Sequence, residues 1–170
     1  MNEQPDHGLI RKEKEFYGDS FVPDLLEQYK LYVQSAENVS ARRVSSNRYL
    51  LALNAALVAL YGLQSTGFGQ GYWMLLIPVI GIPVSLFWYL IIRSHSGLNC
   101  IKFIVIHEFE QHLPAAMYEH EWQLAEEGRG KTYQAVTRIE WRIPILFTVL
   151  HVVLAIMIVL AIAGIADWTN

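Results

Sequence analysis

Residues 72–92 read YWMLLIPVIGIPVSLFWYLII, which is 21 consecutive residues without a charged side chain, and Arg93 follows directly. A helix needs about 20 mostly apolar residues to cross the hydrocarbon core of a bilayer. A second stretch, 143–166, has 24 residues without a formal charge, or about 36 Å of helix at a rise of about 1.5 Å per residue. Both stretches therefore predict transmembrane helices.

A third, weaker stretch covers about 49–66 and reads YLLALNAALVALYGLQST. It is short for a span, but one helical face of it carries only small residues, which let helix backbones approach closely in a membrane. This face predicts packing against helices of the same chain or of another copy. Its members are Ala52, Ala55, Ala56, Ala59 and Gly62. In the alternative, 49–66 is peripheral and the chain has two spans.

The positive charges are partitioned along the chain. All 13 Lys and Arg residues fall within 1–48 and 93–142, and none falls in the apolar stretches. Lys and Arg are retained on the cytoplasmic side of inserted segments. Three spans then place the N-terminus in the cytoplasm and the C-terminus outside, whereas two spans leave both termini in the cytoplasm. The net charge of −3 argues against a nucleic-acid partner.

Aromatic and basic residues near the ends of the apolar stretches are predicted to anchor the chain at the lipid interface. Tryptophan rings favour the headgroup level, and cations favour its cytoplasmic side. The predicted anchors are Arg42, Arg43, Arg48, Trp73, Trp88, Trp141 and Trp168.

The remaining segments complete an all-α integral membrane protein with amphipathic cytoplasmic helices. Residues 1–22 are predicted to be a mobile cytoplasmic tail, and 23–66 a long amphipathic helix that runs into the first span. Residues 93–142 are predicted to be a cytoplasmic helical region, and 167–170 a short outer tail. Within that region, 97–112 predicts a helix with its apolar residues on one face. These are Leu98, Ile101, Ile104, Val105 and Phe109.

The charged segment around 107–121 carries the side chains most suited to metal binding or acid–base chemistry. Its candidates are His107, Glu108, Glu110, His112, Glu119, His120 and Glu121. A zinc protease needs H-E-x-x-H, but this chain has H-E-F-E-Q-H, which turns the second imidazole away from the first. We interpret the segment as a solvated acidic helix face, and the lone Cys100 as a small buried hydrophobe. No catalytic residue, metal site or cofactor is predicted.

Polar residues within the apolar stretches are the remaining candidates for function. They are Asn54, Ser85, Thr148 and His151. Ionisable groups inside a membrane are rare and are candidates for function by default. Two interpretations stay open for them: hydrogen bonds between packed helices, or the lining of a pore in which His151 senses or conducts protons.

Several segments together resemble the RipA-like family of small octameric bacterial membrane proteins. The resemblance rests on YVQSAENVSARR (32–43), LALNAALVALYG (51–62), RSHSGLNCIKFIVIHEFEQHLP (93–114), YEHEW (118–122), KTYQAVTRIEWRIPILF (131–147) and the apolar tail. It implies a bacterial inner (cytoplasmic) membrane protein that forms a homo-oligomer, an octamer by the family's description, with no enzyme activity assigned to it.

The sequence thus favours a non-enzymatic, homo-oligomeric inner-membrane protein that acts as a scaffold or interaction surface in envelope or stress adaptation. Its expected partners are membrane lipids, other copies of itself and a cytoplasmic protein. The alternative is an oligomeric pore or channel, such as the membrane effector of a defence or toxin system.

Overall fold

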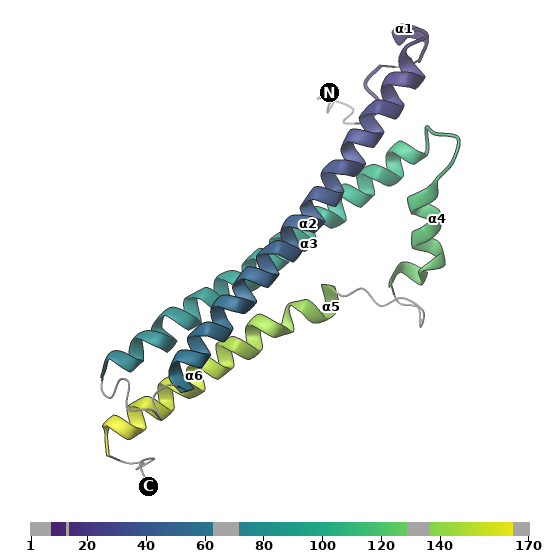
Figure 1. Ribbon diagram of the computed structural model, residues 1–170. Helices are drawn as coiled ribbons and strands as arrows, with labels where there is room; N and C mark the ends of the chain where they lie inside the picture. Colours follow the sequence, from purple (N-terminus) through teal and green to yellow (C-terminus); the bar gives the residue numbers. More distant parts are fainter. Residues whose placement is uncertain (1–7, 13, 63–71, 129–136, 165–170) are drawn as a thin grey trace, which may run out of the picture. The chain divides into compact units, whose positions relative to one another are not determined.

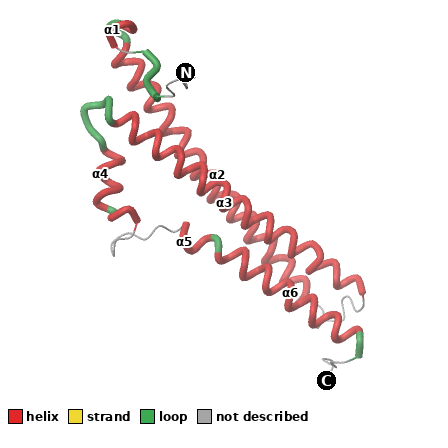
Figure 2. The backbone as a smooth tube through the Cα atoms, turned by 180° about the vertical axis from the view of Figure 1, so that it is seen from behind, coloured by secondary structure: helices red, strands yellow, loops and turns green. Residues whose placement is uncertain are grey.

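The computed structural model describes residues 8–12, 14–62, 72–128 and 137–164, and every regular element in them is helical (Figures 1 and 2). The elements in chain order are α1 Lys14–Tyr17, α2 Phe21–Gly62, the 3-10 turn η2 Tyr72–Leu75, α3 Leu76–Glu110, α4 Met117–Leu124, the 3-10 turn η3 Glu126–Gly128, α5 Thr137–Glu140 and α6 Arg142–Ile162.

The two longest helices, α2 and α3, have 42 and 35 residues. Pro23 falls in the first turn of α2, where its missing N–H leaves no hydrogen bond unmade. The segments predicted separately over 72–92 and 97–112 belong to one continuous helix from Leu76 onward, because arginine is a good helix former and Arg93 does not interrupt it. The predicted end of the first span, 63–66, lies outside the described residues.

The chain divides into two compact units, to which α2 and α3 both contribute. Unit 1 contains Met1–Ala41 and Gly97–Ala135, and unit 2 contains Arg42–Ser96 and Val136–Asn170. Each unit is described by itself below.

Unit 1 is built on the first part of α2 and the last part of α3, which pack antiparallel. Hydrogen bonds join Tyr29 to Glu110 and Ser35 to Lys102, so residue numbers rise along α2 as they fall along α3. The buried core of this unit comprises Leu25, Tyr29, Ala36, Ile106 and Phe109.

The predicted apolar face of 97–112 is divided in the structure. Phe109 is buried and Val105 packs against the core. Leu98, Ile101 and Ile104, which belong to the same predicted face, are exposed. At 100° per residue, Ile101 and Ile104 lie about 100° and 160° around α3 from Lys102, which contacts α2.

Unit 2 packs the second part of α2, the first part of α3 and α6 around two small apolar clusters. Leu50, Trp88 and Ile92 form the first, and Met74, Ile77 and Ile158 form the second. Most of the apolar surface of α6 is left outside these clusters. The exposed large side chains of α6 are Ile143, Ile145, Leu146, Val149, Val152, Val153, Ile156, Val159 and Ile162. An outward surface of this composition suits lipid or another apolar helix.

Two helices in the described part of the chain are long and apolar enough to cross a membrane. They are the run Tyr72–Glu110, which includes η2 and α3, and Arg142–Ile162, which is α6. The all-helical fold and the two main apolar spans therefore agree with the sequence analysis. The third span at about 49–66 and the orientation stay predictions.

Candidate functional site

Three polar side chains meet in the interior of unit 2, and each comes from a different helix. Asn54 belongs to α2, Ser85 to α3 and His151 to α6, and the exposed fraction of each is 0%. Two of them lie close to the first apolar cluster in sequence, since Leu50 is one helical turn before Asn54 and Trp88 is three residues after Ser85. The three residues form the polar cluster of unit 2.

Asn54 is the hub of the polar cluster. Its Nδ2 donates to the carbonyl of Leu50 at 2.9 Å, which fixes the orientation of the amide. Its Oδ1 accepts from the Ser85 hydroxyl at 2.7 Å and lies 3.2 Å from His151 Nε2. Because an amide oxygen only accepts, Nε2 is assigned as the protonated ring nitrogen. His151 Nδ1 is buried and has no hydrogen-bond partner among the described residues.

Gly81 makes room for the imidazole. A Cβ built at Gly81 would overlap the Cε1, Nε2 and Nδ1 atoms of His151. Only a residue without a side chain lets α3 and the ring of His151 come this close. No local sequence pattern reveals this role of Gly81, because Gly81 lies in α3 and His151 in α6.

The four polar residues predicted in the apolar stretches thus separate into two groups. Asn54, Ser85 and His151 come together, but Thr148 does not join them. Its hydroxyl donates to the carbonyl of Pro144, one turn earlier in α6, at 2.9 Å. This bond satisfies the hydroxyl within its own helix.

A buried carboxylate, that of Glu110, lies in unit 1 at the end of α3. Its side chain is 2% exposed and accepts three hydrogen bonds, each of 2.9 Å. The Tyr29 hydroxyl and the Tyr118 N–H donate to Oε1, and the Glu119 N–H donates to Oε2. The interpretation of 107–121 as a solvated acidic face was wrong for Glu110.

The environment of Glu110 explains why its carboxylate is held inside the protein. Tyr118 and Glu119 lie in the first turn of α4, whose own cap residue, Ala116, makes no side-chain hydrogen bond. Glu110 therefore supplies the missing cap from another helix, and its negative charge suits the positive end of the α4 dipole. Burial, followed by the hydrogen bond to Glu110, raises the pKa of the Tyr29 hydroxyl, which keeps Tyr29 a donor.

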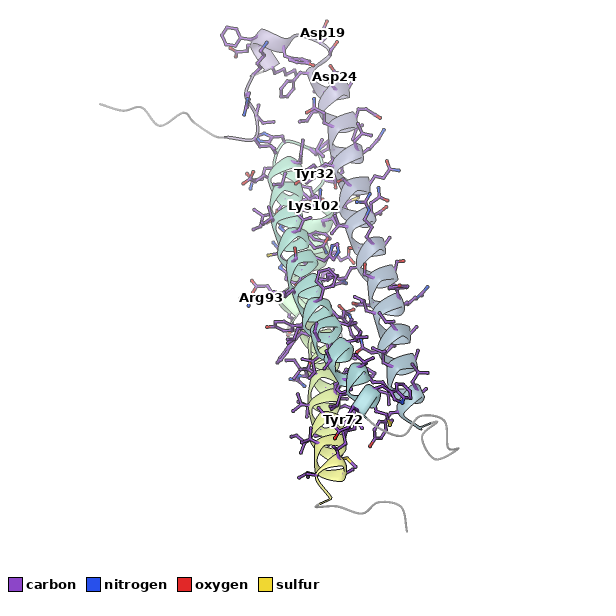
Figure 3. All side chains as sticks on the ribbon, turned by 90° about the vertical axis from the view of Figure 1, so that its left-hand side faces the viewer. Asp19, Asp24, Tyr32, Tyr72, Arg93 and Lys102 are labelled. Carbon is purple, nitrogen blue, oxygen red and sulfur yellow. The ribbon has the colours of Figure 1, made fainter. Side chains whose placement is uncertain are left out.

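The cationic partner of α2 in unit 1 is Lys102. Its Nζ donates to Ser35 Oγ at 2.8 Å and lies 4.5 Å from the centroid of the Tyr32 ring. Figure 3 labels Tyr32 on α2 and Lys102 on α3 at neighbouring positions. A cation over an aromatic face is attracted by the ring quadrupole. The interaction ties α3 to α2 next to the apolar core.

The predicted lipid anchors occupy different environments. Arg42, Arg48, Trp73 and Trp141 are exposed, and Trp168 lies outside the described residues. Trp88 is only 2% exposed and donates from Nε1 to Asn47 Oδ1 at 2.9 Å, so the prediction of a lipid-facing ring is corrected to a core ring. Arg43 lies 3.5 Å from Glu140, and both side chains are largely buried, so this arginine is part of an ion pair within unit 2.

The small-residue face of α2 is exposed, and so is the single cysteine, which lies on α3. Ala52, Ala55, Ala56, Ala59 and Gly62 are all exposed in the chain, whereas Asn54 on the other side of the helix is buried. Cys100 is exposed as well, which corrects the prediction of a buried thiol. It lies beside the exposed face of α3 described above, and the core side of the helix carries Ile106 and Phe109 instead.

These features define a helical membrane protein: two long apolar helices, an outward apolar surface and polar groups turned inward. Residues 26–160 match the octameric membrane protein family (8xMP), and the chain belongs to this family, in agreement with the resemblance found in the sequence. Searches of curated proteins and of solved structures find no similar protein.

Proposed function

We propose that the protein is a non-enzymatic scaffold of the bacterial inner membrane, assembled from eight copies of the chain. Membership of the octameric membrane protein family supports the assembly. The partition of Lys and Arg supports three spans with the N-terminus in the cytoplasm and the C-terminus outside. Unit 1 then lies in the cytoplasm, where it offers a surface to a protein partner in envelope or stress adaptation.

The main support for a scaffold is that the polar side chains within the apolar segments of unit 2 face its interior. Asn54, Ser85 and His151 have no exposed area and bond to one another. The outward surfaces of α6 and of the α2 segment 51–60 are apolar. Surfaces of this kind pack against lipid and neighbouring helices, since small residues allow close helix contact. We therefore propose that the small-residue face of α2 contacts another copy within the membrane.

The pore remains the alternative function, and one observation favours it. His151 Nδ1 is a buried nitrogen without a partner among the described residues. If a change of conformation in the assembly exposed Nδ1 to water, His151 would line a polar pore as its titratable side chain.

Ion flux into vesicles distinguishes the two functions. Ion entry is measured with an ion-sensitive dye trapped inside the vesicles, between about pH 5 and 8, the range in which histidine titrates. Ions are expected to enter vesicles that contain the purified oligomer no faster than protein-free vesicles. His151→Ala should give the same baseline. Flux in the wild type that His151→Ala abolishes would establish the pore and remove the scaffold proposal.

The three-span topology is tested with fusions to alkaline phosphatase, which is active only outside the cytoplasm. A fusion after Asn170 is expected to be active, and a matched fusion after Gln111, between α3 and α4, inactive. An inactive fusion at Asn170 would favour two spans, with 49–66 peripheral.

A further inference from the structure

The exposed apolar face of α3 in unit 1 has no role in the proposed function. Leu98, Ile101 and Ile104 are 45%, 58% and 55% exposed. They are spaced three residues apart and so lie along one side of the helix. We call these three residues the α3 stripe. Each is a large aliphatic side chain that keeps about half of its surface exposed in the single chain.

Lipid is a poor cover for the α3 stripe. Leu98 and Ile104 follow Ile92, the last residue of the uncharged run, by six and twelve residues. At a rise of about 1.5 Å per residue, these positions are roughly 9 and 18 Å further along α3. The headgroup layer extends only about 5–8 Å beyond the hydrocarbon core on each side. A stripe at this depth would therefore meet water unless protein covers it.

We propose that the α3 stripe is a contact surface for a second copy of this chain, outside the hydrocarbon core. The inference rests on the octameric assembly in the proposed function. In a closed ring of identical subunits, every copy presents surfaces that its neighbours bury. Residues of this type in contact with water favour such burial, and the family supplies seven further copies as the occupant.

The charged neighbours of the α3 stripe define its limits. Lys102 lies between Ile101 and Ile104 in sequence, but its Nζ is bonded to Ser35 on the α2 side. The lysine therefore leaves the stripe apolar. Glu108, one turn beyond Ile104, is exposed and closes the stripe with a charge. A central apolar strip with a polar end is the usual composition of a subunit contact.

The test is the mass of the full-length protein in detergent with Ile101→Asn. The wild type is expected at about 156 kDa of protein, eight times the 19.5 kDa chain. Ile101→Asn should shift most of the protein to smaller species at the same concentration, because it places an amide in the centre of the contact. The matched control is Leu31→Asn, since Leu31 lies in the same unit on α2 and is also 58% exposed. It should leave the mass unchanged.

A thiol readout separates lost contact from lost folding. Cys100 is the only cysteine and is exposed in a single chain beside the stripe. Its alkylation should be several-fold slower in the wild-type octamer than in Ile101→Asn, while the two proteins keep equal helical circular dichroism.

The outcomes separate the inference from the proposal on which it rests. If Ile101→Asn still forms the octamer, or if Leu31→Asn loses it equally, the α3 stripe is not the contact surface. The proposed scaffold function would be unaffected by either result. A wild type without an octamer would remove the proposed assembly itself.

Discussion

Replacing Glu110 with alanine is expected to lower the free energy of unfolding of unit 1 by about 3–5 kcal/mol, because breaking a buried charged network strands its remaining partners. The substitution leaves the Tyr29 hydroxyl and the N–H groups of Tyr118 and Glu119 without their acceptor. It also removes the only side-chain cap described for the first turn of α4.

Hydrogen exchange provides the sharpest measurement of this effect. The amides of Tyr118 and Glu119 should lose protection in Glu110→Ala, while those of the core segment around Ala36 change less. Glu110→Gln should fall between the wild type and Glu110→Ala, because one of its two acceptor atoms becomes a donor that faces an N–H group. The matched control is Glu108→Ala, two residues earlier and exposed, which is expected to stay within about 0.5 kcal/mol of the wild type. Equal effects at 108 and 110 would contradict the capping role.

Gly81→Ala is expected to destabilise unit 2 by about 2–3 kcal/mol, since an added methyl group in a packed interior forces neighbours to move. The atoms that must move are those of the His151 ring. Their displacement would also stretch the contact between Nε2 and Asn54 Oδ1.

The specific prediction is a reversal of sign in a second background. With His151→Ala in place, the ring is absent, and Gly81→Ala should be neutral or stabilising by up to about 1 kcal/mol, because alanine is the better helix former. The control is Gly97→Ala in the same helix, with His151 present. It should also be neutral or slightly stabilising, since a Cβ added at Gly97 meets nothing within 4 Å. Unfolding by SDS in mixed micelles measures the stability of the wild type, the three single variants and the double variant. A loss at Gly81 that persists in the His151→Ala background would show that the ring is not its cause.

The apolar spans could be predicted from the sequence because their signal is local. An uncharged run such as 72–92 needs no knowledge of its neighbours, and charge partition extends the argument to orientation. The polar residues inside the spans could also be named, since Asn54, Ser85 and His151 stand out against an apolar background.

What the sequence could not supply is the pairing between distant segments. Asn54 and His151 are 97 residues apart, and Tyr29 and Glu110 are 81 apart. A carboxylate at the end of a charged segment has the same local pattern whether it faces water or caps another helix. At the α3 stripe the periodicity was not enough for a related reason: it identifies apolar faces, but it does not say which of them the same chain covers.

The hydrogen-bond directions in the polar cluster have a consequence for proton movement. A chain of groups relays a proton only if each link can release hydrogen as well as receive it. The amide oxygen of Asn54 has no hydrogen to release, and the bond from its Nδ2 to Leu50 keeps the amide from turning round. Ser85 and His151 therefore both donate to a centre that passes nothing on. In this arrangement no proton can pass between Ser85 and His151 through Asn54. Proton conduction through the cluster would first require the Asn54 amide to rotate.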